Sequence, residues 1–281
     1  MMMTLTGYLK VVRPVNAFVS GLTAALAVLI ATGRLDGPVP LLIAVVTLIT
    51  GAGNVINDYF DYQIDQVNRP NRPIPSGTVS LAGARRYAIL LFIVGVLLSF
   101  GTTPLCALLA VFNTLLLVLY AARLKAVPLI GNLTVSYLAG SIFIFGGALS
   151  GTTGELITLP IAAITFLGMV ARELLKDGED IEGDRAGGAR TLPMLIGVQK
   201  TGWVAFLFAL AGIGASFLPY LTWGQEYLVL IALPDLLILA GALQGLRSVD
   251  STTLRNSRAT LLLKGGMFTA LAAFTASALI L

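Results

Sequence analysis

Runs of about 20 predominantly apolar residues recur along this 281-residue chain, and they limit its fold more than any other feature. Each run is long enough to cross the hydrocarbon core of a bilayer as a helix, which satisfies its own backbone polar groups in lipid. Only 11% of the residues are charged, well below the usual share in soluble domains. The sequence therefore predicts an all-α polytopic membrane protein, with residues 1–281 forming a single integral membrane domain.

Gly and Pro residues divide the apolar runs into nine predicted membrane spans. The spans are predicted at residues 14–32, 39–59, 83–101, 104–121, 131–150, 156–176, 199–219, 227–247 and 262–281. Within the fifth span, Gly140, Gly146 and Gly147 are interpreted as close helix contacts, because small residues let two helix backbones approach each other.

The basic residues lie almost entirely on one predicted side of the membrane. Of the 18 Lys and Arg residues, only Arg34 falls on the side opposite the N-terminus and the loops after the even-numbered spans. The positive-inside rule therefore predicts a multi-pass cell-membrane protein with its N-terminus in the cytoplasm and its C-terminus outside. The excess of cations is explained by this topology, so we expect no nucleic-acid partner.

The chain contains no His, which excludes His-based general bases, His metal sites and nucleophile–His pairs. Its single cysteine, Cys106, cannot form an intrachain disulfide and is interpreted as a packing residue.

Two acidic triads share the pattern D-x-x-D-x-x-x-D. Their members are Asp58, Asp61 and Asp65, then Asp177, Asp180 and Asp184. Residues at i, i+3 and i+7 fall on one face of a helix, where three carboxylates repel each other and favour a cationic ligand. The triads follow the second and sixth spans, so both are predicted on the cytoplasmic side and can converge on one site.

The residues around the triads indicate what such a site binds. Asn54 and Asn57 precede the first triad, R-P-I-P begins at Arg72, and R-T-L-P begins at Arg190. Carboxylate and amide oxygens are ligands that Mg²⁺ prefers, and flanking Arg and Lys side chains can hold a diphosphate. The loop after the fourth span adds Tyr120 and Lys125 on the same side. In an apolar chain these features favour a prenyl diphosphate, whose C–O bond ionises once the leaving group is neutralised.

Three segments carry a family resemblance. NDYFDYQID at residues 57–65, DGEDIEGD at 177–184 and YAARLK at 120–125 resemble the NDxxDxxxD, DxxDxxxD and YxxxK motifs of the UbiA superfamily of intramembrane prenyltransferases. The resemblance covers essentially the whole chain. It implies nine transmembrane helices around a central cavity with cytoplasmic Asp-rich loops, and Mg²⁺-dependent transfer of a polyprenyl group.

The resemblance also implies roles for individual residues. Metal-bridging roles fall on Asn57, Asp58, Asp61, Asp65, Asp177, Asp180 and Asp184. Diphosphate binding is expected of Arg72 and Lys125, to which we add Lys176, Arg190, Arg13 and Asn54 as residues in or beside the motif segments. Catalytic roles are predicted for Asp61, Asp180, Lys125 and Tyr120. The remaining basic residues, including Arg255 and Lys264, are interpreted as topology or lipid-headgroup residues.

The identity of the acceptor is predicted less directly. The segment IDQVNRPNRPIPSG at residues 64–77 is most similar to the archaeal members that attach geranylgeranyl to the free hydroxyl of geranylgeranylglyceryl phosphate. The expected partners are therefore geranylgeranyl diphosphate, a lipid-like acceptor and the bilayer, with no obligate protein partner. Prenylation of an aromatic acceptor of the quinone, haem or chlorophyll type is an alternative. A divalent-cation transporter is the non-enzyme alternative, although basic residues beside the acids would repel a bare cation.

Overall fold

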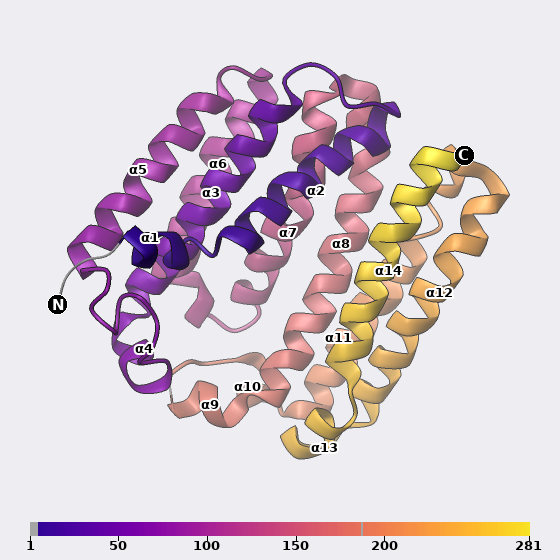
Figure 1. Cartoon of the computed structure of the whole chain (residues 1–281). Helices are drawn as coiled ribbons and strands as arrows, with labels where there is room; N and C mark the ends of the chain where they lie inside the picture. Colours follow the sequence, from indigo (N-terminus) through magenta and orange to yellow (C-terminus); the bar gives the residue numbers. More distant parts are fainter. Residues whose placement is uncertain (1–4, 187) are drawn as a thin grey trace.

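The computed structural model describes residues 5–186 and 188–281, and within these two stretches the regular structure is helical throughout (Figure 1). Nine of the described helices are long and apolar enough to cross a membrane. They are α2 (Pro14–Thr32), α3 (Val39–Phe60), α5 (Leu81–Ser99), α6 (Pro104–Ala122), α7 (Ile130–Leu149), α8 (Gly151–Glu179), α11 (Val198–Ala215), α12 (Tyr220–Arg247) and α14 (Ala259–Ile280). Shorter helices are α1 (Leu5–Val11), α4 (Tyr62–Asn68), the 3₁₀ helix η1 (Leu124–Ala126), α9 (Ile181–Ala186), α10 (Leu192–Ile196) and α13 (Ser251–Asn256).

These helices confirm the nine predicted spans, with the largest differences in α8 and α12. Helix α8 begins at Gly151 rather than at 156, because the glycines that suggested a loop lie inside its first turns. Helix α12 begins at Tyr220 rather than at 227, but it is broken at Gly224, whose φ of 71° and ψ of −158° are not helical. Glycine adopts that backbone conformation without the steric cost of a Cβ atom.

The long helices pack around three apolar clusters. One cluster joins α2, α3, α5 and α6, and a second joins α8, α11, α12 and α14. The third contains residues of α2, α7, α8, α12 and α14, so it connects the two groups. Many large apolar side chains remain exposed on the outside, such as Leu221 and Val229. An apolar outer surface of this kind is suited to lipid rather than water.

Glycines in α7 allow its neighbours to approach closely. A Cβ atom on Gly140 would lie 2.7 Å from the carbonyl oxygen of Ala162 in α8. On Gly146 it would lie 2.4 Å from the Cβ of Ala27 in α2, and on Gly147 it would lie 2.0 Å from Oγ1 of Thr158. The interpretation of these glycines as close helix contacts is confirmed.

The short helices α4, α9 and α13 gather at one end of the bundle, at the bottom of Figure 1, and the C-terminus lies at the other end. The two acidic segments run from α3 into α4 and from α8 into α9. Both triads therefore lie at the same end of the molecule.

Candidate functional site

Each acidic triad spans a junction between two helices. Helix α3 ends at Phe60 and α4 begins at Tyr62, so Asp61 lies between them, and Asp180 lies in the same way between α8 and α9. The expectation of one continuous helix face is therefore modified. The amides of Asp61 and Asp180 still donate to carbonyls four residues earlier, at 2.9 and 3.1 Å. Because this hydrogen bonding continues through the junctions, the helical spacing of the acids is largely kept.

Two carboxylates of the first triad are buried and share a guanidinium group. Asp58 and Asp65 are 3% and 4% exposed. Arg72 Nη1 donates to Asp58 Oδ1 at 3.1 Å and to Asp65 Oδ2 at 2.6 Å. Arg13 Nη2 donates to Asp58 Oδ1 at 2.5 Å. Two guanidinium groups thus neutralise two buried carboxylates, as buried charges require.

The loop between α4 and α5 positions Arg72. Ile74 and Val79 are buried. The carbonyl of Pro73 accepts hydrogen bonds from the Val79 amide at 3.0 Å and from the Thr78 hydroxyl at 2.9 Å. The apolar anchors and this shared acceptor fix the turn in which R-P-I-P lies, so the Arg72 side chain points back to α3 and α4.

Arg13 occupies the connection between α1 and α2 in a left-handed backbone conformation, with φ of 52°. Such a conformation is unusual for a residue with a side chain and costs on the order of 1–3 kcal/mol. Asn54 Nδ2 donates to the carbonyl of Val12 at 2.9 Å, which ties this connection to α3. Asn54 therefore supports the position of Arg13.

The third member of the first triad pairs with the loop after α6. Lys125, in the short helix η1, forms a salt bridge with Asp61, and both side chains are partly exposed. Tyr120 lies in the last turns of α6, where the charges of Glu173, Asp177 and Asp61 act on its hydroxyl. The YAARLK segment, which has one residue more between Tyr and Lys than the YxxxK motif, thus lies between the two acidic segments.

The second triad is held by different partners. Asp177 accepts a hydrogen bond from Asn132 Nδ2 at 2.8 Å. Asp180 pairs with Lys176 at 2.6 Å. Burial raises the pKa of Asp184 above its ordinary value, repulsion from Asp180 raises it further, and Lys176 acts in the opposite direction. A cation bound beside Asp184 would offset both of the effects that disfavour its charge.

A polar cavity of about 730 Å³ contains residues from both acidic segments. The predicted site residues that line it are Asn57, Asp61, Asp65, Asp180, Asp184, Arg13, Arg72 and Lys125. Asp58, Asp177 and Lys176 lie beside these residues without lining the cavity, and Arg190 is exposed with no described contact to it. Asn54 and Tyr120 lie deeper and line a second cavity.

Sequence reasoning missed several residues of the polar site. Arg69 and Arg255 line the cavity, and Arg255 Nη2 also donates to the carbonyl of Glu179 at 2.6 Å. Asn132 supports Asp177 from α7. The interpretation of Arg255 as a topology residue does not place it in the site, and its nearest sequence signal is the capping box of Asp250 and Thr253 that begins α13. A capping box locates a helix start, but it does not indicate what the helix lies against.

The second cavity, of about 350 Å³, continues from the polar one into the bundle. Asn57 lines both cavities. Beyond it the walls include Val46, Ile49, Leu138 and Phe145. The two cavities together therefore offer a charged compartment followed by a largely apolar one.

The donor atoms suit a hard divalent cation. In the described part of the chain, no three acidic side chains are grouped closely enough to hold a metal ion by themselves. Most of the acids of the two triads are paired with cations or with Asn132. Asn57 Oδ1 is buried and has no hydrogen-bond partner among the described residues. Carboxylate and amide oxygens are the ligands of Mg²⁺, which also keeps phosphate oxygens and water. The residues present fit such an ion together with a phosphate-bearing ligand.

This fold and this site define a helical membrane protein in which a charged cavity at one end of the bundle adjoins a largely apolar one. The model of the UbiA prenyltransferase family matches residues 17–275, and the chain belongs to this family.

Relatives extend over the whole chain. A digeranylgeranylglyceryl phosphate synthase of Methanoculleus marisnigri is 52% identical over 279 residues, covering 99% of this chain and 100% of the relative. A protein of the same name from Methanoregula boonei is 55% identical over 279 residues, with the same coverage.

Solved structures have a similar fold. A structure described as digeranylgeranylglyceryl phosphate synthase in membranes has a TM-score of 0.89 and 33% identity, covering 99% of both chains. A UbiA homolog from Archaeoglobus fulgidus bound to GPP and Mg²⁺ has a TM-score of 0.69, covering 95% of this chain and 99% of that one. Its identity is 17%, so this second likeness concerns the fold alone.

Proposed function

We propose that this protein transfers a geranylgeranyl group from its diphosphate to the free hydroxyl of geranylgeranylglyceryl phosphate, and that the whole chain acts as one prenyltransferase domain. The observation that carries the proposal is the charged cavity that receives residues from both acidic segments and continues through Asn57 into an apolar one. The names of the relatives support the choice of acceptor.

The diphosphate and the prenyl tail of the donor, geranylgeranyl diphosphate, bind in different cavities. Arg13, Arg72 and Lys125 hold the diphosphate in the polar cavity, where charge-assisted hydrogen bonds to phosphate are strong. Lys176, which pairs with Asp180, and Arg190, which follows the cavity residue Ala189, contribute positive charge near this cavity in the proposed site. The prenyl tail extends past Asn57 into the cavity between α3 and α7, where burial of apolar surface stabilises it.

Mg²⁺ is the proposed cofactor, and when bound it supplies Lewis-acid neutralisation of the leaving diphosphate. The residues assigned to it are Asn57, Asp58, Asp61, Asp65, Asp177, Asp180 and Asp184, and those that line the cavity and would hold it directly are Asn57, Asp61, Asp65, Asp180 and Asp184. The other two, Asp58 and Asp177, would act from behind the cavity wall, by neutralising Arg13 and Arg72 and by setting the charge around Tyr120.

The reaction is a substitution at the first carbon of the prenyl chain. The C–O bond to diphosphate breaks and its electron pair leaves with the diphosphate. Asp61 and Asp180 keep the positive charges that neutralise this leaving group, such as those of Lys125 and Lys176, in place. The allylic cation is captured by the glycerol oxygen, which forms the ether bond, and the hydroxyl proton passes to the departing diphosphate. Tyr120, at the inner edge of the polar region, helps to hold the reacting carbon apart from water.

We also propose how the protein is oriented in the membrane. The end of the bundle with α4, α9 and α13 faces the cytoplasm, which places the N-terminus inside and the C-terminus outside. The excess of Lys and Arg on this side supports the assignment.

The experiment uses the purified protein in nanodiscs with labelled geranylgeranyl diphosphate and Mg²⁺. Transfer to geranylgeranylglyceryl phosphate is compared with transfer to 4-hydroxybenzoate, and EDTA should abolish it until Mg²⁺ is restored in excess. Asp61→Asn and Asp180→Asn should each lower turnover at least 100-fold, because they remove charge while keeping shape. Asp36→Asn is the matched control, since Asp36 is exposed and pairs with Arg34 at the other end of the bundle.

The alternatives give different results. Transfer to the aromatic acid but not to the glyceryl phosphate would replace the proposed acceptor. Absence of diphosphate release with any acceptor, together with Mg²⁺ flux in liposomes, would support a transporter instead.

A further inference from the structure

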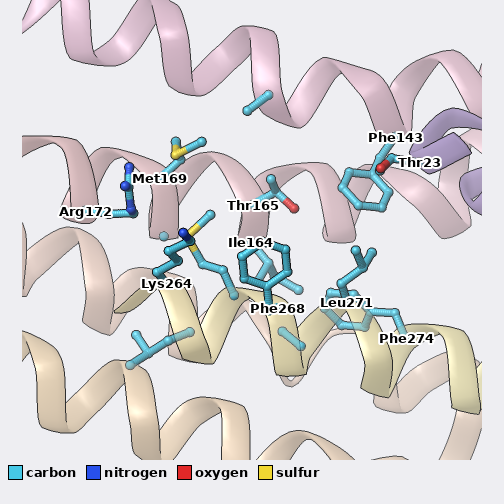
Figure 2. A pocket seen from close by; sticks show the side chains of 15 residues that line it. Thr23, Phe143, Ile164, Thr165, Met169, Arg172, Lys264, Phe268, Leu271 and Phe274 are labelled. Carbon is cyan, nitrogen blue, oxygen red and sulfur yellow. The ribbon is translucent and has the colours of Figure 1, made fainter. Parts of the chain in front are cut away.

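A third cavity lies between α8 and α14, and the proposed donor site does not account for it. It has a volume of about 280 Å³ and walls from α2, α7, α8, α12 and α14 (Figure 2). We call it the α8–α14 cavity. Phe143, Ile164, Leu271 and Phe274 form apolar walls, and no acidic residue lines it. Phe268, at its edge, is 62% exposed, so the cavity opens toward the lipid-facing surface.

Two cations stand together at one end of this cavity. In Figure 2, Arg172 of α8 and Lys264 of α14 lie at the end beside Met169, and Phe143, Leu271 and Phe274 lie at the opposite end. Arg172 precedes Lys176 by about one helical turn, so the cationic end faces the acidic segments. The cavity therefore has the polarity of an amphiphile with an anionic head and an apolar tail.

Both cations retain capacity for an anion. The Lys264 ammonium forms no ion pair among the described residues and lies 5.8 Å from the centroid of the Phe268 ring. Arg172 forms a salt bridge with Glu173 through Nη1. A guanidinium has five N–H donors, so Arg172 can keep Glu173 and still bind an anion through its other donors.

The α8–α14 cavity adjoins the inner cavity of the donor site. Ala139 of α7 and Met169 of α8 line both. The side chains of these two residues, one small and one flexible, thus form part of the wall between the two cavities. In a prenyl glyceryl phosphate, the glycerol hydroxyl lies between the phosphate and the tail, beside this shared wall.

We propose that the α8–α14 cavity binds the acceptor, a prenyl glycerol that carries a phosphate monoester. Arg172 and Lys264 hold the phosphate, and the apolar walls hold the first part of the tail, which continues into the bilayer. This inference rests on the proposed function, because it assigns the second substrate of that reaction. It makes Arg172 and Lys264 the residues that select a phosphorylated acceptor.

The test measures steady-state kinetics for both substrates with Arg172→Gln, Lys264→Gln and Lys264→Arg in nanodiscs of neutral lipid. The two Gln variants should raise KM for geranylgeranylglyceryl phosphate about tenfold or more, and they should leave KM for geranylgeranyl diphosphate unchanged. Lys264→Arg should retain most of the acceptor affinity, since it keeps the charge. Lys200→Gln, which removes an exposed lysine of α11, should change neither constant.

A second pair of variants tests the cavity without changing charge. A Cβ atom on Gly168 meets only Met267, at 3.7 Å, so a larger side chain there can fold and extend into the cavity. Gly168→Leu should raise the acceptor KM, whereas Gly214→Leu, at a glycine with no atom within 4 Å of the added Cβ, should not.

The acceptor without its phosphate separates the outcomes. Wild-type protein should prefer the phosphorylated acceptor to the corresponding alcohol, and the Gln variants should lose this preference. An unchanged preference in both Gln variants, or an effect that appears only when anionic phospholipid is added, overturns the acceptor site and leaves the proposed function intact. If the wild-type protein fails to release diphosphate whichever prenyl glycerol acceptor is supplied, the proposed function itself is overturned.

Discussion

Removing Arg72 should destabilise the protein even in the absence of ligand. Its Nη1 atom lies 2.6 Å from Asp65 and 3.1 Å from Asp58, and both carboxylates are nearly inaccessible. Breaking a buried ion pair by removing one partner costs about 3–5 kcal/mol, because an uncompensated charge stays buried. The Arg72 side chain is 20% exposed and Asp58 keeps Arg13. We therefore expect Arg72→Met to lower the free energy of unfolding by about 2–4 kcal/mol.

A double-mutant cycle measures the interaction between Arg72 and Asp65. Asp65→Asn keeps the shape of the side chain and removes the charge that Arg72→Met leaves uncompensated. The double variant should therefore be less destabilised than the sum of the two single variants, by about 1–3 kcal/mol. Unfolding is followed in detergent with EDTA present, using the fluorescence of the two tryptophans, Trp203 and Trp223.

A surface pair supplies the control for this cycle. Arg34 and Asp36 form a salt bridge with side chains that are 76% and 60% exposed, so Arg34→Met should cost less than about 1 kcal/mol. Effects of Arg72→Met and Asp65→Asn that add within about 0.5 kcal/mol would refute the reasoning, as would an Arg72→Met cost no larger than that of Arg34→Met.

The remaining predictions concern three other positions. Lys125→Met should raise KM for the prenyl diphosphate about 10- to 100-fold, because one charge-assisted contact is lost; Lys10→Met, at an exposed residue of α1, is its control, and equal constants for both variants would exclude Lys125 from the donor site. Asp184→Asn should stabilise the metal-free protein at neutral pH, since burial raises the pKa of this carboxyl above 3.8 and the folded state disfavours its charged form. The gain should disappear as pH falls below 3.8, where Asp184 is protonated in both states, and a gain that persists there would show a cause other than charge. Gly140→Val should destabilise the contact between α7 and α8 by about 1–3 kcal/mol, whereas Gly265→Val, with no atom within 4 Å of the added Cβ, should be nearly neutral; equal unfolding midpoints would contradict this.

The sequence predicts the helices well because lipid leaves the backbone few choices. Apolar run length fixes the spans, and Gly and Pro give most of their ends. Gly151 and Gly224 are the exceptions, because one lies in the first turn of a helix and the other interrupts a helix that continues beyond it. A local signal of that kind is the same whether the helix ends, bends or continues.

The site is predicted only as far as its residues lie in recognisable segments. The spacing of the Asp residues and the YAARLK segment indicates Asp61, Asp65, Asp180, Asp184 and Lys125, which line the polar cavity. It also indicates Asp58 and Asp177, which do not line it, and Tyr120, which lines the second cavity instead. The sequence predicts only a topology role for Arg255 and Lys264, because a cation near a span end gives the same pattern whether it sets topology or binds a ligand. Their positions depend on which helices pack against α8, and this contact is not encoded in the residues next to them.

The helix junctions have an electrostatic consequence. Asp58 and Asp177 lie in the last turns of α3 and α8, where each helix macrodipole contributes roughly half a negative charge. Acids are more stable at helix amino ends, so this placement adds to their repulsion. Arg13, Arg72, Lys125 and Lys176 therefore serve the ligand-free protein as internal counter-ions. In the function proposed above, substrate binding at this site would be an ion exchange, in which these internal ion pairs are replaced by pairs with the ligand.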